Sequence, residues 1–291
     1  MKIKAIKSLS IIILSSLCTG QAFSYDWPVK KTETNQIISY FGQKKGENFV
    51  TGLTIKDAEE VYASDEGNPL IVIEDSDDDT DFFPSALGTA IIIHHNDNLI
   101  SVYSNLDRTS IKDEPYTKTL TKEEIIGKAG NSGYKDDLSA VGFQIIDLKE
   151  KKAINPQILL PSTAQVLPLS ISGIHLKNKN GVLYDLQYAK NFNYGVYKVY
   201  FKRNELAVPF KTAVLVNGET EDEIIYSSLN QENGKTNVLG KVNYQLSDIY
   251  PDDRLMLAGS VNLRPGKATL SLIFTDIKES SRQLNYSITV H

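Results

Sequence analysis

The chain has 291 residues, of which 41% are hydrophobic and 23% are charged, a composition that excludes a disordered protein. A single cysteine excludes an internal disulfide framework and a cysteine-based zinc site. With 36 acidic against 31 basic residues, a nucleic-acid partner is not expected, because phosphate contacts require clustered lysines and arginines. The length predicts about two domains.

Residues 1–24 have the pattern of a secretory signal peptide. Three lysines precede a short apolar run at 9–17, and Ala22 and Ser24 supply small residues at a cleavage site. The run is too short to span a membrane, so we expect export to the periplasm or extracellular space, with no membrane span after cleavage. Leu17 is bulky where a lipoprotein signal has a small residue, so lipidation of Cys18 is not expected. Cleavage removes three lysines and no acidic residue, which changes the formal net charge from −5 to −8.

Strand patterns dominate the rest of the chain, and an all-β fold class is predicted. Short segments rich in Val, Ile, Tyr and Thr are separated by turn sequences such as Asn217-Gly218 and Asn233-Gly234. Sustained helical periodicity is absent, although Thr121–Ile126 could form one helical turn. The clearest expected strands are 70–73, 90–95, 99–103, 142–148, 196–201, 213–216 and 269–274.

A domain boundary is expected near residues 156–170, where Pro156, Pro161 and Pro168 cluster in the sequence. We therefore divide the mature chain into residues 25–161 and 162–291. The second part has about seven or eight strand patterns, which favours an antiparallel, Ig-like β-sandwich.

The first of these domains carries short motifs in a characteristic order. They are Val50-Thr51-Gly52-Leu53-Thr54, Tyr103-Ser104-Asn105-Leu106, the glycine-rich segment 126–133 and Ala140-Val141-Gly142-Phe143-Gln144. In this order and spacing, residues 27–161 resemble the M23 family of zinc metallopeptidases, the LytM-like peptidoglycan endopeptidases. The resemblance implies an antiparallel β-sheet domain with a metal-binding groove across one sheet.

The resemblance also shows which chemistry is missing. Val50 and Thr54 stand where the family has a histidine and an aspartate that bind zinc, and neither replacement is a suitable zinc ligand. Asn105 stands where a histidine stabilises the transition state. Ala140 and Gly142 replace the histidines that act as base and as last zinc ligand. We therefore expect no catalytic residue, no metal ligand and no cofactor.

The histidine count supports this expectation independently. The only histidines are His94, His95, His175 and His291. Neighbouring residues of a strand point to opposite faces, so His94 and His95 cannot both reach one metal ion. His95, at the end of an expected strand, is interpreted as a histidine with its hydrogen bonds satisfied. The four residues cannot rebuild the family's site.

One other cluster could hold a cation. The run Asp75–Asp81 contains five aspartates and could bind calcium through oxygen ligands, but it lacks the glycine and the final glutamate of a calcium-binding loop. A solvated loop between strands is the preferred interpretation.

The predicted function is that of an exported, catalytically inactive M23 homologue, a binding or regulatory module of the cell envelope. Its expected partner is an envelope protein or a peptidoglycan peptide. The alternatives are an active peptidoglycan metalloendopeptidase with a non-standard metal site, and a purely structural envelope protein. Substitution of Asn105 by arginine is expected to reduce binding if the former groove is used. The expected groove lining is Val50, Thr54, Tyr103, Asn105, Ala140, Gly142 and Gln144.

Overall fold

The computed structural model describes residues 25–30, 36–74, 85–111, 118–133, 139–162, 168–204 and 207–291. The expected signal peptide at 1–24 and the acidic run at 75–81 lie outside these ranges, so both interpretations stay predictions. In the described part of the chain, no helix is both long and apolar enough to cross a membrane.

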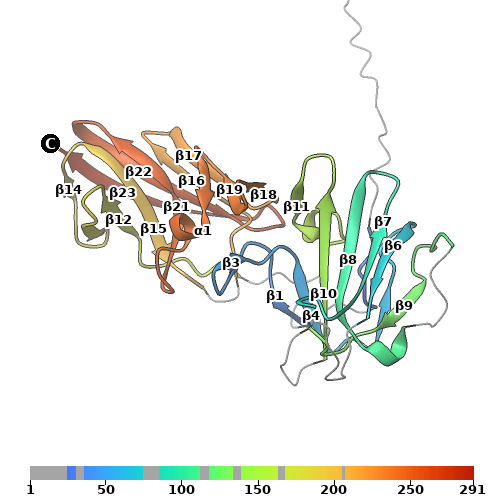
Figure 1. Ribbon diagram of the computed structural model, residues 1–291. Coiled ribbons are helices and arrows are strands. Elements are labelled where there is room, and N and C mark those ends of the chain that lie inside the picture. Colours follow the sequence, from blue (N-terminus) through green and yellow to red (C-terminus); the bar gives the residue numbers. More distant parts are fainter. Residues whose placement is uncertain are drawn as a thin grey trace, which may run out of the picture.

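The described residues form an all-β structure, as predicted, and each of the seven clearest expected strands overlaps an observed one (Figure 1). The expected helical turn at 121–126 is wrong. The Glu124 carboxylate accepts a hydrogen bond from the Thr121 N–H, which closes a tight turn, and Ile125 then begins a strand. The first half contains β1 (Ile37–Ser39), β2 (Lys44–Lys45), β3 (Asn48–Phe49), β4 (Leu53–Lys56), β5 (Glu60–Tyr62), β6 (Asn68–Ile73), β7 (Thr89–His94), β8 (Leu99–Leu106), η2 (Arg108–Ser110), β9 (Ile125–Lys128), β10 (Ala140–Asp147), β11 (Lys152–Ile154) and η3 (Pro156–Ile158).

The second half is also built from strands, with one short helix that sequence periodicity did not indicate. Four residues are too few to produce a helical pattern. The elements are β12 (His175–Asn178), β13 (Leu183–Asp185), β14 (Asn191–Phe192), β15 (Gly195–Lys202), β16 (Lys211–Val216), β17 (Glu219–Ile225), β18 (Ser228–Glu232), β19 (Lys235–Leu239), β20 (Asn243–Gln245), α1 (Leu246–Ile249), β21 (Leu255–Leu263), β22 (Gly266–Thr275) and β23 (Ser281–Val290).

The N-terminal half is organised around β10. This strand pairs antiparallel with β4, β8 and β11, and the sheet continues from β8 through β7 to β6. Alternate residues of β10 point to opposite faces. Val141, Phe143 and Ile145 are fully buried in the core of this half, so Gly142 and Gln144 belong to the other face.

The C-terminal half contains two sheets that enclose a second core. One sheet has the order β13-β12-β15-β21 and the other β14-β23-β22-β16-β17. Phe201 of the first sheet packs against Phe274 of the second, with ring centroids 4.9 Å apart. The arrangement is a two-sheet sandwich, while its assignment as Ig-like stays a prediction.

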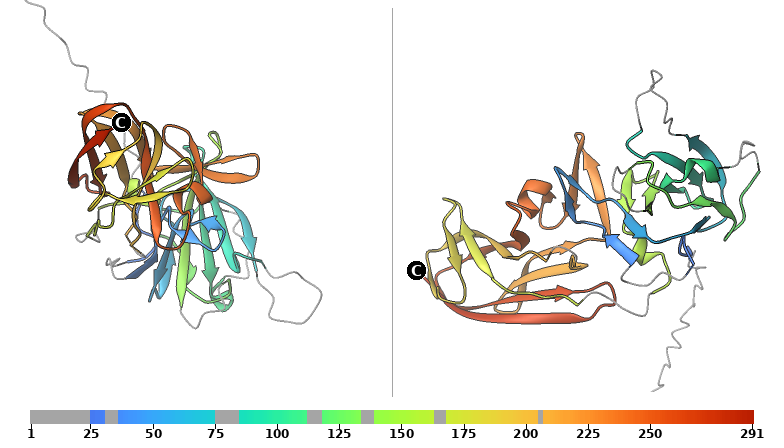
Figure 2. Two further views of the ribbon diagram at one scale, coloured as in Figure 1. Left: turned by 90° about the vertical axis from the view of Figure 1, so that its left-hand side faces the viewer. Right: turned by 90° about the horizontal axis from the view of Figure 1, so that it is seen from below.

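The two halves share a sheet. β18 pairs with β11, so β18, β19 and β20 extend the N-terminal sheet at its end (Figure 1). In the right-hand view of Figure 2, the sandwich and the N-terminal sheet lie end to end, with the C-terminus at the far end of the sandwich. The boundary at residues 161 and 162 stays a prediction, but strand pairing crosses it.

The β2–β3 hairpin is held by the C-terminal half. Phe41, which precedes it, and Phe49, the last residue of β3, are buried in the second core, and each buried phenylalanine stabilises by about 1.5–3 kcal/mol. The Tyr250 hydroxyl donates to the Gly42 carbonyl at 2.7 Å, and Lys44 lies 2.8 Å from an Asp253 carboxylate oxygen. The loop that leads to Val50 is therefore fixed by both halves.

Candidate functional site

Two of the three expected zinc-binding positions, 54 and 142, lie on the face of the sheet opposite the core. Thr54 of β4, Gly142 of β10 and Ser104 of β8 are direct partners in the strand register and form one row across three strands. Val50 lies in the loop before β4, where its N–H donates to the Gln43 carbonyl at 2.8 Å. The fold thus brings Thr54 and Gly142 together, while the approach of Val50 to them stays a prediction.

The residues at these positions do not fit a zinc ion. Val50 offers a hydrocarbon side chain, Thr54 a neutral hydroxyl and Gly142 no side chain at all. A Cβ atom at Gly142 would lie 2.3 Å from the Ser104 Oγ, so this hydroxyl occupies the space of any ligand there. In the described ranges, no group of three or more His, Cys, Asp or Glu side chains could hold a metal ion.

Gly52 is retained from the family motif for a steric reason. A Cβ atom at this position would lie 2.2 Å from the Phe143 carbonyl oxygen, which belongs to the backbone of β10. Only glycine permits this approach of the two chain segments. The chain can therefore keep glycine at position 52 for packing reasons, although the zinc ligands of the family motif are replaced.

Asn105 is a structural brace and does not line an open groove, contrary to expectation. The residue is fully buried and has a positive φ of 63°, a conformation that asparagine tolerates better than most residues. Its Nδ2 donates to the carbonyls of Gly130 and Ala140 at 2.7 and 2.8 Å, and its Oδ1 accepts from the Gly133 N–H at 2.8 Å. The amide thus ties β8 to the glycine-rich turn and to the first residue of β10.

Tyr103 also does not lie in the expected lining of the groove. Its ring is fully buried and packs against Phe143 with centroids 5.3 Å apart, on the core side of the sheet. Its hydroxyl accepts a hydrogen bond from the Ser64 N–H at 2.8 Å, and burial raises its pKa above the ordinary value. Thr54, Ala140 and Gly142 are buried as well, which leaves Val50 and Gln144 of the seven expected residues half-buried at the surface.

A second group of residues on this face was missed by sequence reasoning. Ile71 of β6, Ile92 of β7, Ile100 of β8 and Ile146 of β10 all point away from the core, and Ile71 is 53% exposed. Ile71 pairs with Ile92, and Ile100 pairs with Ile146. Across β7 and β8, Ile92 pairs with Val102 and Ile100 with His94, so the two isoleucine pairs are diagonal neighbours on one face of the sheet, here named the isoleucine face. The signal was the run 91–93, because three successive isoleucines make both faces of a strand apolar.

His95 has its hydrogen bonds satisfied, as interpreted from the sequence. It is 1% exposed, its Nδ1 lies 2.8 Å from the Glu66 carbonyl and its Nε2 lies 2.8 Å from the Ser101 Oγ. The Tyr25 ring packs edge-on against it at 5.1 Å. These contacts fix the end of β7 against the core.

The burial of His95 makes the stability of the folded protein sensitive to acid. Desolvation lowers its pKa below the usual 6.5, so the folded state favours the neutral ring. Below about pH 6.5 the unfolded chain takes up a proton that the folded chain resists, and stability falls by up to about 1.4 kcal/mol per pH unit. We expect urea titrations between pH 7.5 and 5 to show a flatter pH dependence in His95→Gln. The matched control is His291→Gln at the exposed C-terminus, and equal slopes in all three proteins would contradict this assignment.

A search of the curated proteins finds no match. Similar solved structures include a SpoIIQ–SpoIIIAH pore forming complex, with 19% identity over 49% of this chain and 94% of that chain, and a TM-score of 0.37. Another is a mutant catalytic domain of the prophage-encoded M23 protein EnpA from Enterococcus faecalis, with 20% identity over 45% and 95% of the two chains, and a TM-score of 0.35.

Family models cover both halves of the chain. One model matches residues 168–291, which include the sandwich. The model of peptidase family M23 matches residues 33–156. These residues contain the row of Thr54, Gly142 and Ser104, where the structure offers no zinc ligands. Residues 33–156 of this chain are thus similar to peptidase family M23, without the zinc ligands at residues 50, 54 and 142.

Proposed function

We propose that this protein is an exported, catalytically inactive M23 homologue that binds a partner at the cell envelope. The observation that carries the proposal is the replacement of the zinc ligands by Val50, Thr54 and Gly142, with the Ser104 hydroxyl in the remaining space. An M23 fold without ligands retains a shaped surface but has no means of activating water.

The isoleucine face supports an envelope protein as the partner in preference to a peptidoglycan peptide. Its side chains are apolar and half-buried or exposed, and contiguous exposed apolar surface marks interaction sites in soluble proteins. Gln144 borders it on β10, two residues from Ile146, where its half-buried amide adds hydrogen-bonding groups. An apolar centre with a polar margin is the usual anatomy of a protein interface.

The test is retention of envelope proteins by the immobilised chain, together with incubation of the chain with purified peptidoglycan. Ile71→Asp places a charge in the isoleucine face, and we expect it to weaken retention at least tenfold. Val196→Asp, at a 60% exposed strand position of the sandwich, is the matched control and should retain the partner normally. No muropeptide release is expected from any of the proteins.

Two other outcomes would contradict this proposal. Loss of retention in Val196→Asp alone would place binding on the sandwich. Muropeptide release that depends on zinc would support the alternative of an active metalloendopeptidase with a non-standard site.

A further inference from the structure

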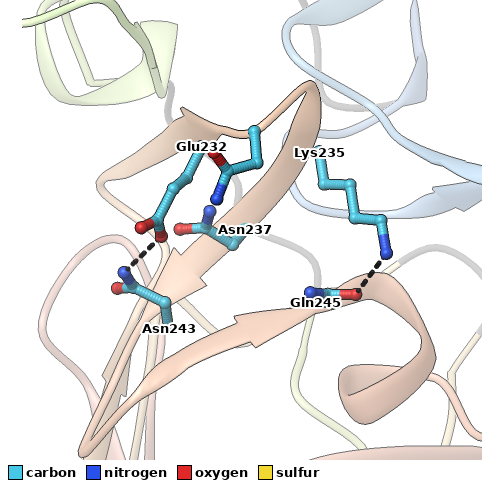
Figure 3. Close-up of a pocket in the computed structure, with 6 residues that line it drawn as sticks. Glu232, Lys235, Asn237, Asn243 and Gln245 are labelled. Atoms are coloured by element: carbon cyan, nitrogen blue, oxygen red, sulfur yellow. Dashed lines mark hydrogen bonds between the residues drawn. The ribbon is translucent and has the colours of Figure 1, made fainter.

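A polar pocket lies on the strands that join the two halves. It has a volume of about 210 Å³ and is lined by residues of β18, β19, β20 and the turn at Asn233 (Figure 3). The opposite side of these strands carries Leu229, Val238 and Tyr244, which are buried in the second core. The pocket is therefore on the outer face of a sheet that is firmly packed from behind.

Asn237 at the centre of this face carries an unexplained polar atom. The side chain is 3% exposed, and its Oδ1 is buried without a hydrogen-bond partner. A buried acceptor left unpaired destabilises a folded protein, so such groups occur where a ligand or another partner completes them. Glu232 and Asn243 are exposed side chains beside it (Figure 3).

The charges of the pocket are separated into two ends. Glu232 and Lys235 are direct partners in the strand register, yet each bonds to a different neighbour. The Glu232 carboxylate accepts from Asn243 Nδ2 at 3.1 Å, and Lys235 Nζ donates to Gln245 Oε1 at 3.4 Å. Figure 3 shows these two pairs on opposite sides of the pocket, with the Asn237 amide near the acidic pair.

This arrangement matches a small zwitterion. The acidic end offers the Glu232 carboxylate and the unpaired Asn237 Oδ1 as acceptors, and an ammonium group has three donors to satisfy them. At the other end, the Lys235 ammonium and the Gln245 amide can donate to a carboxylate. We propose that this pocket binds the free amino and carboxyl groups of an amino acid or dipeptide. The site is separate from the isoleucine face and does not depend on the function proposed above.

The probe is alanyl-alanine with free termini, titrated into the purified chain while the side-chain amide signals of Asn237, Asn243 and Gln245 are followed by NMR. We expect saturable shifts of these signals, and at least tenfold weaker binding for the N-acetylated and the C-amidated dipeptides. Glu232→Gln and Lys235→Met should each weaken binding at least tenfold. The controls Glu47→Gln and Lys149→Met change exposed charges elsewhere and should leave it unaltered.

Asn237→Leu separates a binding role from a structural one. Since it removes an unpaired buried acceptor, we expect unchanged or higher thermal stability together with loss of dipeptide binding. Four results would each overturn the proposal. The first two are lower thermal stability of Asn237→Leu and undiminished binding of the capped dipeptides. The other two are saturable binding of N-acetylglucosamine instead of alanyl-alanine, and no saturation by any probe. None of these results bears on retention by the isoleucine face.

Discussion

Asn105→Ala is expected to reduce the free energy of unfolding by about 4 kcal/mol, a large part of the 5–15 kcal/mol typical of a folded domain. The substitution removes the hydrogen bonds to the Gly130 and Ala140 carbonyls and from the Gly133 N–H, each worth about 1 kcal/mol net, while the Gly130 carbonyl still accepts from the Ala140 N–H. It also places alanine at a φ of 63°, which adds about 1 kcal/mol. Urea unfolding measures the change.

Asn98→Ala is the matched control, because Asn98 has the same φ of 63° but lies exposed in a turn. We expect this variant to lose only the conformational contribution. Similar losses in both variants would show that the three hydrogen bonds of Asn105 contribute little.

The burial of Asn105 also changes what the substitution Asn105→Arg tests. This substitution introduces a charge at a fully buried position, so it tests folding and not binding in a groove.

Restoration of the family's ligands is expected to create a zinc site. The variant carries Val50→His, Thr54→Asp and Gly142→His, with Ser104→Ala to remove the hydroxyl that lies 2.3 Å from a Cβ at Gly142. Thr54 and Gly142 are register partners, so both new side chains project from adjacent strands on one face. Three ligands are enough for a catalytic type of zinc site, and we expect about one zinc per chain by elemental analysis.

The matched control for this variant keeps Gly142 and carries the other three substitutions. With two ligands only, it should lose its zinc during dialysis. Retention of zinc by the control at the same level would show that the metal is held elsewhere, and absence of zinc from the full variant would show that Val50 is not positioned as the resemblance implies.

The sequence predicted the strands and the missing chemistry for clear physical reasons. Strand periodicity is local, so segments such as 90–95 and 269–274 could be recognised from their own residues. The absence of zinc ligands at Val50, Thr54 and Gly142 could be predicted from the order of the motifs along the sequence alone. Gly52 could be aligned for the same reason, since its close approach to Phe143 permits no other residue.

The orientation of single side chains was not predictable in the same way. Asn105 leaves the regular strand conformation through its positive φ, so alternation along β8 does not give its direction. Its three hydrogen bonds reach residues 25 to 35 positions away in the chain. The pairing of β11 with β18 is likewise a contact between distant segments, and it made one sheet out of what the proline cluster suggested were two separate domains.

The central proposal, that the M23-like residues 33–156 hold no zinc, is tested most directly by the zinc content of the unaltered purified chain after incubation with zinc and dialysis. Because its donor set at residues 50, 54 and 142 contains a single neutral hydroxyl, we expect no zinc above the protein-free blank. One zinc per chain, lost on substitution of Thr54 by valine, would contradict the account.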